Sequence, residues 1–146
     1  MSDCLFCKII AGEIPAQIVS EDEHSLAFLD RSPVLHGHTL VVPKRHVDTL
    51  LDLPPELAAP VFEHVRLIGR AFEDALGAEG SFVAVNVKVS QTVPHLHVHV
   101  MPRKRGDGMK GFFWPRRQYA SDEAREEIRK AIADSVDKLR KQSRAS

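Results

Sequence analysis

The clearest pattern in this chain is the segment His95-Leu96-His97-Val98-His99-Val100-Met101, in which three histidines alternate with aliphatic residues. Successive side chains of a β-strand point to opposite faces, so a strand here would carry the three imidazoles on one face and the aliphatic side chains on the other. A merely solvent-facing strand gives no reason to place three of the chain's eight histidines in this alternation. We therefore expect residues 96–101 to form a strand that packs one face in the core and uses the other for chemistry.

Two kinds of chemistry fit three histidines on one strand. Three imidazoles can hold a catalytic zinc ion, but residues four apart on a strand lie roughly 13 Å from each other, so one shared ion would need a bent strand. One histidine could still bind a metal with ligands from elsewhere. Alternatively, a neutral imidazole can attack phosphorus when its second nitrogen donates a hydrogen to a fixed acceptor. A neighbouring histidine can then bind phosphate oxygens or protonate the leaving group, and water hydrolyses the covalent phosphoryl-histidine intermediate.

The segments around the histidines predict an α+β fold with an antiparallel sheet. Strands are indicated at residues 16–20, 25–29, 39–42, 82–87 and 96–101. Apolar residues three or four apart from Pro54 to Leu76 predict one long helix, with Asp52 as its cap and Gly77 at its end. Ser121 is expected to cap a second helix near the C-terminus. One long helix between runs of adjacent strands favours an antiparallel sheet over repeated βαβ units.

Length, composition and charge narrow the class of protein. A chain of 146 residues with 43% hydrophobic residues is expected to form one domain with its own core. Lysine and arginine balance aspartate and glutamate at twenty each, which disfavours binding to a nucleic-acid backbone. No glycine-rich phosphate loop follows a predicted strand, which argues against a Rossmann or P-loop site. No long apolar segment predicts a membrane span or a secretory signal, so we expect a cytoplasmic protein.

The only two cysteines, Cys4 and Cys7, lie three residues apart. A structural disulfide does not persist in a cytoplasmic chain, so the pair is interpreted as free thiols, metal ligands or a redox pair. A structural zinc ion takes four ligands, so a zinc site would need two more side chains from elsewhere in the chain.

The alternation from His95 to Met101 resembles the signature of the histidine-triad (HIT) superfamily. Further blocks resemble that family in the same order: Cys4-Leu5-Phe6-Cys7-Lys8-Ile9-Ile10, Glu13-Ile14-Pro15-Ala16, Ala27-Phe28-Leu29-Asp30, Pro33, Gly37-His38, Val42-Pro43-Lys44-Arg45-His46 and Gln91-Thr92-Val93-Pro94. The resemblance covers residues 4–105. It implies a HIT-like α+β fold, with a five-stranded antiparallel sheet, one long central helix and a C-terminal helix, usually in a homodimer. It also implies an enzyme that hydrolyses or transfers nucleoside monophosphate groups.

The resemblance implies roles for single residues. His97 would be the nucleophile at the α-phosphorus, and His99 would contact the phosphate and assist the leaving group. The polar residues around the phosphate and the leaving group would be Asn86, Gln91 and Thr92. The nucleotide pocket would include Phe6, Ile9, Ile14, Phe28 and Asp30, with His38 as a fourth histidine beside the triad. By their residue types alone, Ile9, Ile14 and Phe28 would be assigned to the core.

For bacterial members with an N-terminal Cys-x-x-Cys pair, the resemblance implies a structural zinc ion. Its ligands here would be Cys4, Cys7, His46 and His95, a closed Cys₂His₂ set. The ion would tie the N-terminus to the histidine segment and leave two histidines of the triad for chemistry. A reduced thiol pair in the core is the alternative. No cofactor is expected for the reaction itself.

Two segments depart from the family pattern. Residues 86–91 lack the usual glycines, with Ser90 where glycine commonly precedes the glutamine, so backbone contacts to phosphate are expected to differ. Residues 103–117 form a basic and aromatic loop, in which Trp114 could stack on a substrate or hold the last helix to the sheet. We expect residues 1–105 to form the HIT core and residues 106–146 to form a loop and helix packed on the same domain.

The leading functional hypothesis is a hydrolase that cleaves at the α-phosphate of a nucleoside 5′-phosphate derivative, either a dinucleoside polyphosphate or a phosphoramidate. A nucleotidyltransferase of the same superfamily is the first alternative, although that branch usually carries glutamine at the position of His99. The second alternative is a non-catalytic protein that binds nucleotide or zinc for an interaction. The expected partners are a nucleotide and a second copy of the chain, without nucleic acid or membrane.

Overall fold

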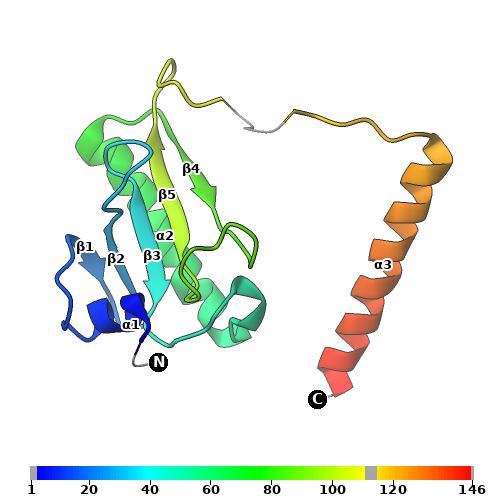
Figure 1. The fold of residues 1–146 in the computed structure, drawn as a ribbon, viewed down its shortest axis with the longest axis horizontal. Helices are drawn as coiled ribbons and strands as arrows, with labels where there is room; N and C mark the ends of the chain where they lie inside the picture. Colours follow the sequence, from blue (N-terminus) through cyan, green and yellow to red (C-terminus); the bar gives the residue numbers. More distant parts are fainter. Residues whose placement is uncertain (1–2, 111–114, 146) are drawn as a thin grey trace. The chain divides into compact units, whose positions relative to one another are not determined.

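The structure is a computed structural model that describes residues 3–110 and 115–145, and it divides after Asp107 into two compact units. The first unit contains α1 (Leu5–Ile10), β1 (Ile18–Glu21), β2 (Ser25–Leu29), β3 (Thr39–Pro43), the short 3₁₀ helix η1 (Leu50–Asp52), α2 (Pro55–Leu76), β4 (Gly80–Ala84) and β5 (Val98–Arg103) (Figure 1). The second unit contains α3 (Asp122–Ala145). Within the described residues, no helix is long and apolar enough to cross a bilayer.

The five strands form one antiparallel sheet in the order β1-β2-β3-β5-β4. The hairpin between β1 and β2 forms as predicted, and its turn is stabilised by Asp22, whose Oδ1 accepts hydrogen bonds from the backbone N–H groups of His24 and Ser25. This arrangement confirms the predicted α+β fold with a five-stranded antiparallel sheet.

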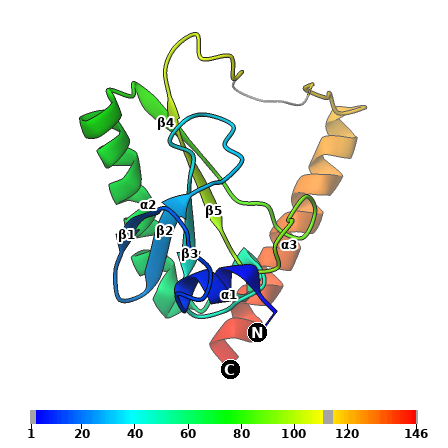
Figure 2. The same cartoon turned by 60° about the vertical axis from the view of Figure 1, so that its left-hand side comes forward.

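Both faces of the sheet are covered. Alternation along β2 and β3 sends Ala27 and Val41 to one face, where they pack with Val65 and Phe72 of α2. It sends the intervening side chains of these strands to the other face, where they pack with Phe6 of α1. Figures 1 and 2 show α2 along the sheet and the short α1 on its opposite side. Helix α2 packs along one face over β2 to β5, whereas the short α1 covers less of the other face, which leaves that face more open to a ligand.

One of the two predicted ends of α2 is confirmed and the other is wrong. Gly77 closes α2 in the left-handed region with φ 64°, as predicted. The predicted cap by Asp52 is wrong, because the Asp52 carboxylate instead accepts hydrogen bonds from the backbone and side chain of Thr49 and completes a capping box on η1. Helix α1 was not predicted, since six residues are too few to show a helical period.

The histidine segment is displaced from the predicted strand. Strand β5 begins at Val98 and runs to Arg103, so of the three triad histidines only His99 lies within it. The reason is that the backbone N–H of Leu96 donates to the carbonyl of Val47 at 2.8 Å instead of to a neighbouring strand. The predicted start of the strand at Leu96 is therefore wrong, and His97 lies before the strand, although Leu96, Val98 and Val100 are all fully buried, as the alternation requires.

Strand β4 also ends earlier than predicted, at Ala84 instead of Val87. The chain then turns through a loop in which Lys88 and Ser90 adopt φ values of 67° and 61°. These left-handed conformations favour glycine. The loop therefore keeps a backbone suited to glycine although its residues are Lys and Ser.

The second unit has a helix with a clear cap and an apolar stripe. Ser121 Oγ accepts a hydrogen bond from the N–H of Ala124 at 3.0 Å, which confirms the predicted cap. No residue of α3 is buried, and its exposed apolar residues Ile128, Ile132, Val136 and Leu139 follow helical spacing. The packing of residues 106–146 on the core stays a prediction, and Trp114 lies outside the described residues.

Candidate active site and metal centre

A pocket of about 910 Å³ lies on the face of the sheet that carries α1. Its apolar walls come from α1, from the segment before β1, and from β2 and β3. Its lining residues include Phe6, Ile9, Ile14, Phe28, Leu40, Asp30, Thr92, His97 and His99. The volume lies within the range of small-molecule sites, and a few polar groups converge on an otherwise apolar cavity.

The hydrogen bonding of His97 determines which ring nitrogen carries the hydrogen. Its Nδ1 lies 2.8 Å from the carbonyl oxygen of His95, and a carbonyl can only accept, so Nδ1–H is the donor. In the neutral ring, Nε2 therefore carries the lone pair. The side chain of His97 also lies against Phe6, with ring centroids 5.1 Å apart in an edge-to-face arrangement. These contacts hold an unprotonated nitrogen in a fixed orientation at the pocket.

A second chain of hydrogen bonds sets the state of His99. The backbone N–H of Val34 donates to His38 Nδ1 at 3.1 Å, so a neutral His38 carries its hydrogen on Nε2. That nitrogen lies 2.9 Å from His99 Nδ1, which accepts, and the hydrogen of a neutral His99 is consequently on its Nε2. The ring centroids of His99 and His97 lie 5.0 Å apart. The pocket thus combines a bare imidazole nitrogen on His97 with an N–H donor on His99.

Burial favours the neutral form of both His38 and His99. Burial, together with nearby His97 and His38, lowers the pKa of His99 to about 4. Burial also lowers the pKa of His38, against the opposing effect of the Asp30 carboxylate. Neither imidazole is therefore charged near neutral pH, so the two rings can lie side by side without charge repulsion while their N–H groups donate hydrogen bonds.

Asp30, His38 and His99 bring three possible ligand atoms within 4.8 Å of one another. The hydrogen bonds that run from Val34 through His38 to His99 nevertheless favour a hydrogen-bonded chain over a metal site. A metal on His38 Nε2 would require the hydrogen to sit on Nδ1, where the Val34 N–H already points. Asp30 is engaged in its own turn, since its Oδ1 accepts from the N–H of Ser32.

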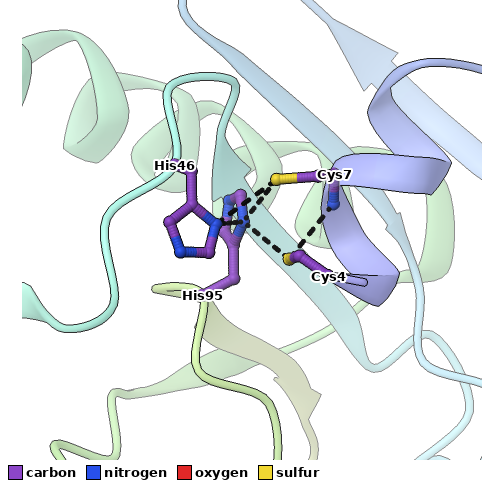
Figure 3. Close-up of side chains that lie close together, drawn as sticks. All are labelled: Cys4, Cys7, His46 and His95. Atoms are coloured by element: carbon purple, nitrogen blue, oxygen red, sulfur yellow. Dashed lines mark hydrogen bonds between the residues drawn. The ribbon is translucent and has the colours of Figure 1, made fainter. Parts of the chain in front are cut away.

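A different cluster has the chemistry of a metal centre. Cys4, Cys7, His46 and His95 come from α1, the segment after β3 and the segment before β5, and their sulfur and Nδ1 atoms point toward one another (Figure 3). The distances from sulfur to Nδ1 are 3.3, 3.3 and 3.5 Å, and the two Nδ1 atoms lie 3.1 Å apart. Tetrahedral zinc with ordinary bond lengths requires about 3.3 Å between two nitrogens and about 3.6 Å between nitrogen and sulfur. The four side chains fit that ion.

Outer hydrogen bonds support the same assignment. His95 Nε2 donates to the carbonyl of Pro43 at 2.9 Å, and His46 Nε2 donates to Asp48 Oδ1 at 2.8 Å, so both Nδ1 atoms are bare in neutral rings. Two bare nitrogens 3.1 Å apart repel unless a cation or an extra proton lies between them. Carboxylate and carbonyl partners of this kind are typical of metal-binding histidines. Burial lowers the pKa of His95, which keeps its ring neutral, as a ligand must be.

Comparison with known proteins places this geometry in a family. The family model described as HIT domain matches residues 11–106 of the chain. The chain belongs to the HIT family. This match includes the triad, two of the four residues of the metal cluster and the pocket residues from Ile14 onward, whereas Cys4, Cys7 and the pocket residues of α1 precede it.

Several relatives of this HIT protein align over most of their length. It is 43% identical over 139 residues to Protein hit of Bacillus subtilis, with 93% of both chains covered. It is 41% identical over 108 residues to Adenylylsulfatase HINT3 of Arabidopsis thaliana, covering 73% of this chain and 55% of that protein. It is 36% identical over 114 residues to Adenosine 5′-monophosphoramidase hnt1 of Schizosaccharomyces pombe, covering 77% of this chain and 83% of that one. A zinc-bound histidine-triad protein from Mycobacterium smegmatis shares the fold with a TM-score of 0.71 at 38% identity, covering 93% of this chain and 97% of that chain.

The HIT domain brings most of the predicted site residues to the pocket, but not all. Those that line it are Phe6, Ile9, Ile14, Phe28, Asp30, Thr92, His97 and His99. His38 lies behind His99 and acts through it. Asn86 and Gln91 shape the neighbouring loop: the Asn86 side chain donates to the carbonyl of Ser90, and Gln91 Nε2 donates to the carbonyl of Asp48 at 2.6 Å.

Some pocket residues were not predicted. Leu40 lies on β3 and faces the pocket beside Phe28, and strand alternation in residues 39–42 could have identified it. Arg31 also lines the pocket, next to Asp30, and no pattern in the sequence distinguishes it from other turn residues. In the basic loop that begins at residue 103, Arg103 pairs with Asp107 and Arg105 pairs with Glu79.

Proposed function

We propose that this HIT protein is a hydrolase that cleaves at the α-phosphorus of a nucleoside 5′-phosphate derivative through a covalent intermediate on His97. The observation that carries the proposal is the hydrogen bond from His97 Nδ1–H to the carbonyl of His95, which leaves Nε2 unprotonated at the pocket. An imidazole nitrogen with a free lone pair is a nucleophile.

The reaction has two steps. In the first, His97 Nε2 forms a bond to the α-phosphorus while the bond to the leaving group breaks, and the leaving group takes a proton from solvent. His99 stays neutral, and its Nε2–H donates a hydrogen bond to the phosphate and the departing group. In the second, water attacks phosphorus, the P–N bond breaks, and the proton lost by water passes to solvent. The products are a nucleoside monophosphate and the protonated leaving group.

The pocket suits a nucleoside. The apolar side chains of Ile9, Ile14 and Phe28 offer contact to a base, and the Asp30 carboxylate offers acceptors to ribose hydroxyls. Thr92 supplies a hydroxyl next to the histidines, while Asn86 and Gln91 hold the loop that precedes it. The names of two relatives, an adenylylsulfatase and an adenosine monophosphoramidase, support an adenylyl derivative with an oxygen or nitrogen leaving group.

Turnover of a substrate panel tests the proposal. The panel holds a dinucleoside polyphosphate, an adenosine phosphoramidate and an adenylyl sulfate. Replacing His97 with Ala should reduce turnover by about 10⁴-fold while adenosine monophosphate still binds. The matched control is His36→Ala, which removes an exposed imidazole that does not line the pocket and should leave turnover unchanged. If His97→Ala retains turnover, the mechanism is wrong, and if the native chain binds nucleotide without turnover, it is a binding protein.

A transferase would behave differently with a phosphorylated acceptor. In the presence of a sugar phosphate, it would form a nucleotidyl-sugar product at the expense of the monophosphate. A hydrolase should yield the monophosphate alone. Mass spectrometry of peptides digested without acid should find the transient nucleotidyl group on the peptide that contains His97, because a bond from phosphorus to histidine nitrogen is labile in acid.

We also propose that zinc occupies the Cys4, Cys7, His46 and His95 site with a structural role. The support is the distance set given above and the zinc-bound relative. Metal analysis of the purified protein should find about one zinc per chain, and Cys7→Ser should abolish it. A homodimer and a cytoplasmic location stay predictions, the first of them from the family resemblance.

A further inference from the structure

Helix α1 belongs to both the metal centre and the pocket. Cys4 caps its N-terminus through a hydrogen bond from the N–H of Cys7 to Cys4 Sγ, and both sulfurs belong to the metal cluster. Leu5, Phe6 and Ile9 of the same helix line the pocket. A helix of six residues is too short to be stable by itself, so its position depends on its tertiary anchors.

Phe6 joins these two roles most directly. It is 5% exposed and makes edge-to-face contacts with both His95 and His97, at centroid distances of 5.9 and 5.1 Å. His95 makes a second link, because its ring lies in the metal cluster while its carbonyl accepts from His97 Nδ1–H. A displacement of α1 or of His95 would therefore change the pocket wall and the orientation of His97 together.

The loop before the triad is tied to the same place. Gln91 donates to the carbonyl of Asp48, and Leu96 donates to the carbonyl of Val47, the two residues that follow His46. The metal cluster thus lies where α1, residues 46–48 and residues 91–97 converge. An ion bound there would cross-link these three segments, two of which, α1 and residues 91–97, line the pocket.

We propose that zinc in the Cys4–Cys7–His46–His95 site controls the affinity of the pocket for a nucleoside monophosphate by fixing the position of α1. The proposal rests on the proposed function of the pocket as a nucleotide site. Because linkage is reciprocal, nucleotide bound in the pocket must raise the affinity for zinc by the same factor that zinc raises the affinity for nucleotide. Both affinities, that for zinc and that for nucleotide, can be measured without turnover.

The test uses the full chain and adenosine monophosphate as the probe. Calorimetry measures its Kd for zinc-loaded and chelator-treated protein, and competition with a chelating dye measures the zinc affinity with and without adenosine monophosphate. We expect zinc removal to weaken nucleotide binding about tenfold, and nucleotide to raise the zinc affinity by the same factor. His46→Asn should weaken nucleotide binding as chelation does, because His46 is a metal ligand that does not line the nucleotide pocket.

A pair of phenylalanine variants locates the coupling. Phe6→Leu should retain zinc but reduce the coupling factor. Phe72→Leu makes the same change at a similarly buried phenylalanine of α2, on the other face of the sheet, and should leave the coupling factor unchanged. Equal loss of coupling in both variants would overturn the role of α1.

The outcomes separate this inference from the proposed function. If folded zinc-free protein binds adenosine monophosphate as tightly as the zinc-loaded form, the coupling is wrong and the nucleotide site stands. If neither form binds it, both proposals fail. Should the zinc-free chain unfold, the competition measurement on folded, zinc-loaded protein decides, and a zinc affinity insensitive to nucleotide would overturn the coupling.

Discussion

Acidification should destabilise this protein through His99, and the effect can be isolated with one substitution. The folded protein holds the imidazole of His99 in a half-buried position beside His38 and His97, where its pKa falls from 6.5 to about 4. In the unfolded chain the same imidazole titrates near its ordinary value. Between these two values the unfolded state binds more protons than the folded state, so stability falls as pH decreases through this window.

The magnitude follows from the two pKa values. At pH 7.5 both states leave His99 neutral, and its contribution to the pH dependence is close to zero. At about pH 4.5 the unfolded imidazole is almost fully charged and the folded one mostly neutral, which costs about 2.5 kcal/mol at 1.4 kcal/mol per unit of pKa difference. The sign is a loss of unfolding free energy on acidification, which begins below about pH 6.5 and is complete below about pH 4.

Urea unfolding of the native chain and of His99→Asn measures this contribution. Asn offers an acceptor oxygen close to the position of the imidazole Nδ1, so the hydrogen bond from His38 Nε2 is retained while the titrating ring is removed. The variant should be less stable at pH 7.5 because it loses packing. The difference in unfolding free energy between the native chain and the variant should shrink by about 2.5 kcal/mol at pH 4.5, since the variant lacks the cost of keeping an imidazole neutral.

Comparing the two chains at the same pH removes other acid-sensitive contributions, including the loss of a bound metal. Parallel curves of unfolding free energy against pH for the two proteins would refute the reasoning. In that case burial would not keep His99 neutral, and its assignment as a neutral N–H donor in the empty pocket would have to be abandoned.

Three further substitutions test other features. Gly37→Ala should lower the unfolding free energy by about 2–3 kcal/mol, because φ is 102° and the new Cβ would lie 3.0 Å from Pro102 Cγ; an unchanged urea midpoint would contradict this. Ser90→Gly should raise the unfolding free energy by about 0.5 kcal/mol by relieving a φ of 61°, and a loss of stability would show that the serine side chain matters more than the backbone. Asp48→Asn should weaken zinc binding about tenfold through its bond to His46, measured by dye competition, whereas unaltered affinity would remove Asp48 from the support of that ligand.

The sequence predicted the sheet better than it predicted the local path of the histidine segment. Period-two burial is a property of side chains, and Leu96, Val98 and Val100 obey it. Hydrogen bonding to a neighbouring strand is a separate property, which depends on what lies beside the chain. Before Val98 that neighbour is the carbonyl of Val47, in a loop that no local pattern places there.

The candidate site, too, was predictable in one respect and not in another. Residue types and family resemblance indicated which side chains gather at the pocket, but not which nitrogen of each imidazole carries a hydrogen. That information comes from backbone groups, the carbonyl of His95 for His97 and the N–H of Val34 for His38. Similarly, Gln91 belongs to the expected polar set, yet its side chain is used to anchor a loop, because the carbonyl of Asp48 lies within reach.

The double attachment of His95 has a practical consequence for engineering. Its ring lies in the metal cluster, whereas its carbonyl oxygen orients His97, so side chain and main chain can be addressed separately. Replacing the ring deletes a metal ligand and leaves the acceptor in place. A route to a metal-independent variant therefore begins at residue 95 with a side chain that fills the same buried volume, followed by selection for mutations that rigidify the amino-terminal helix.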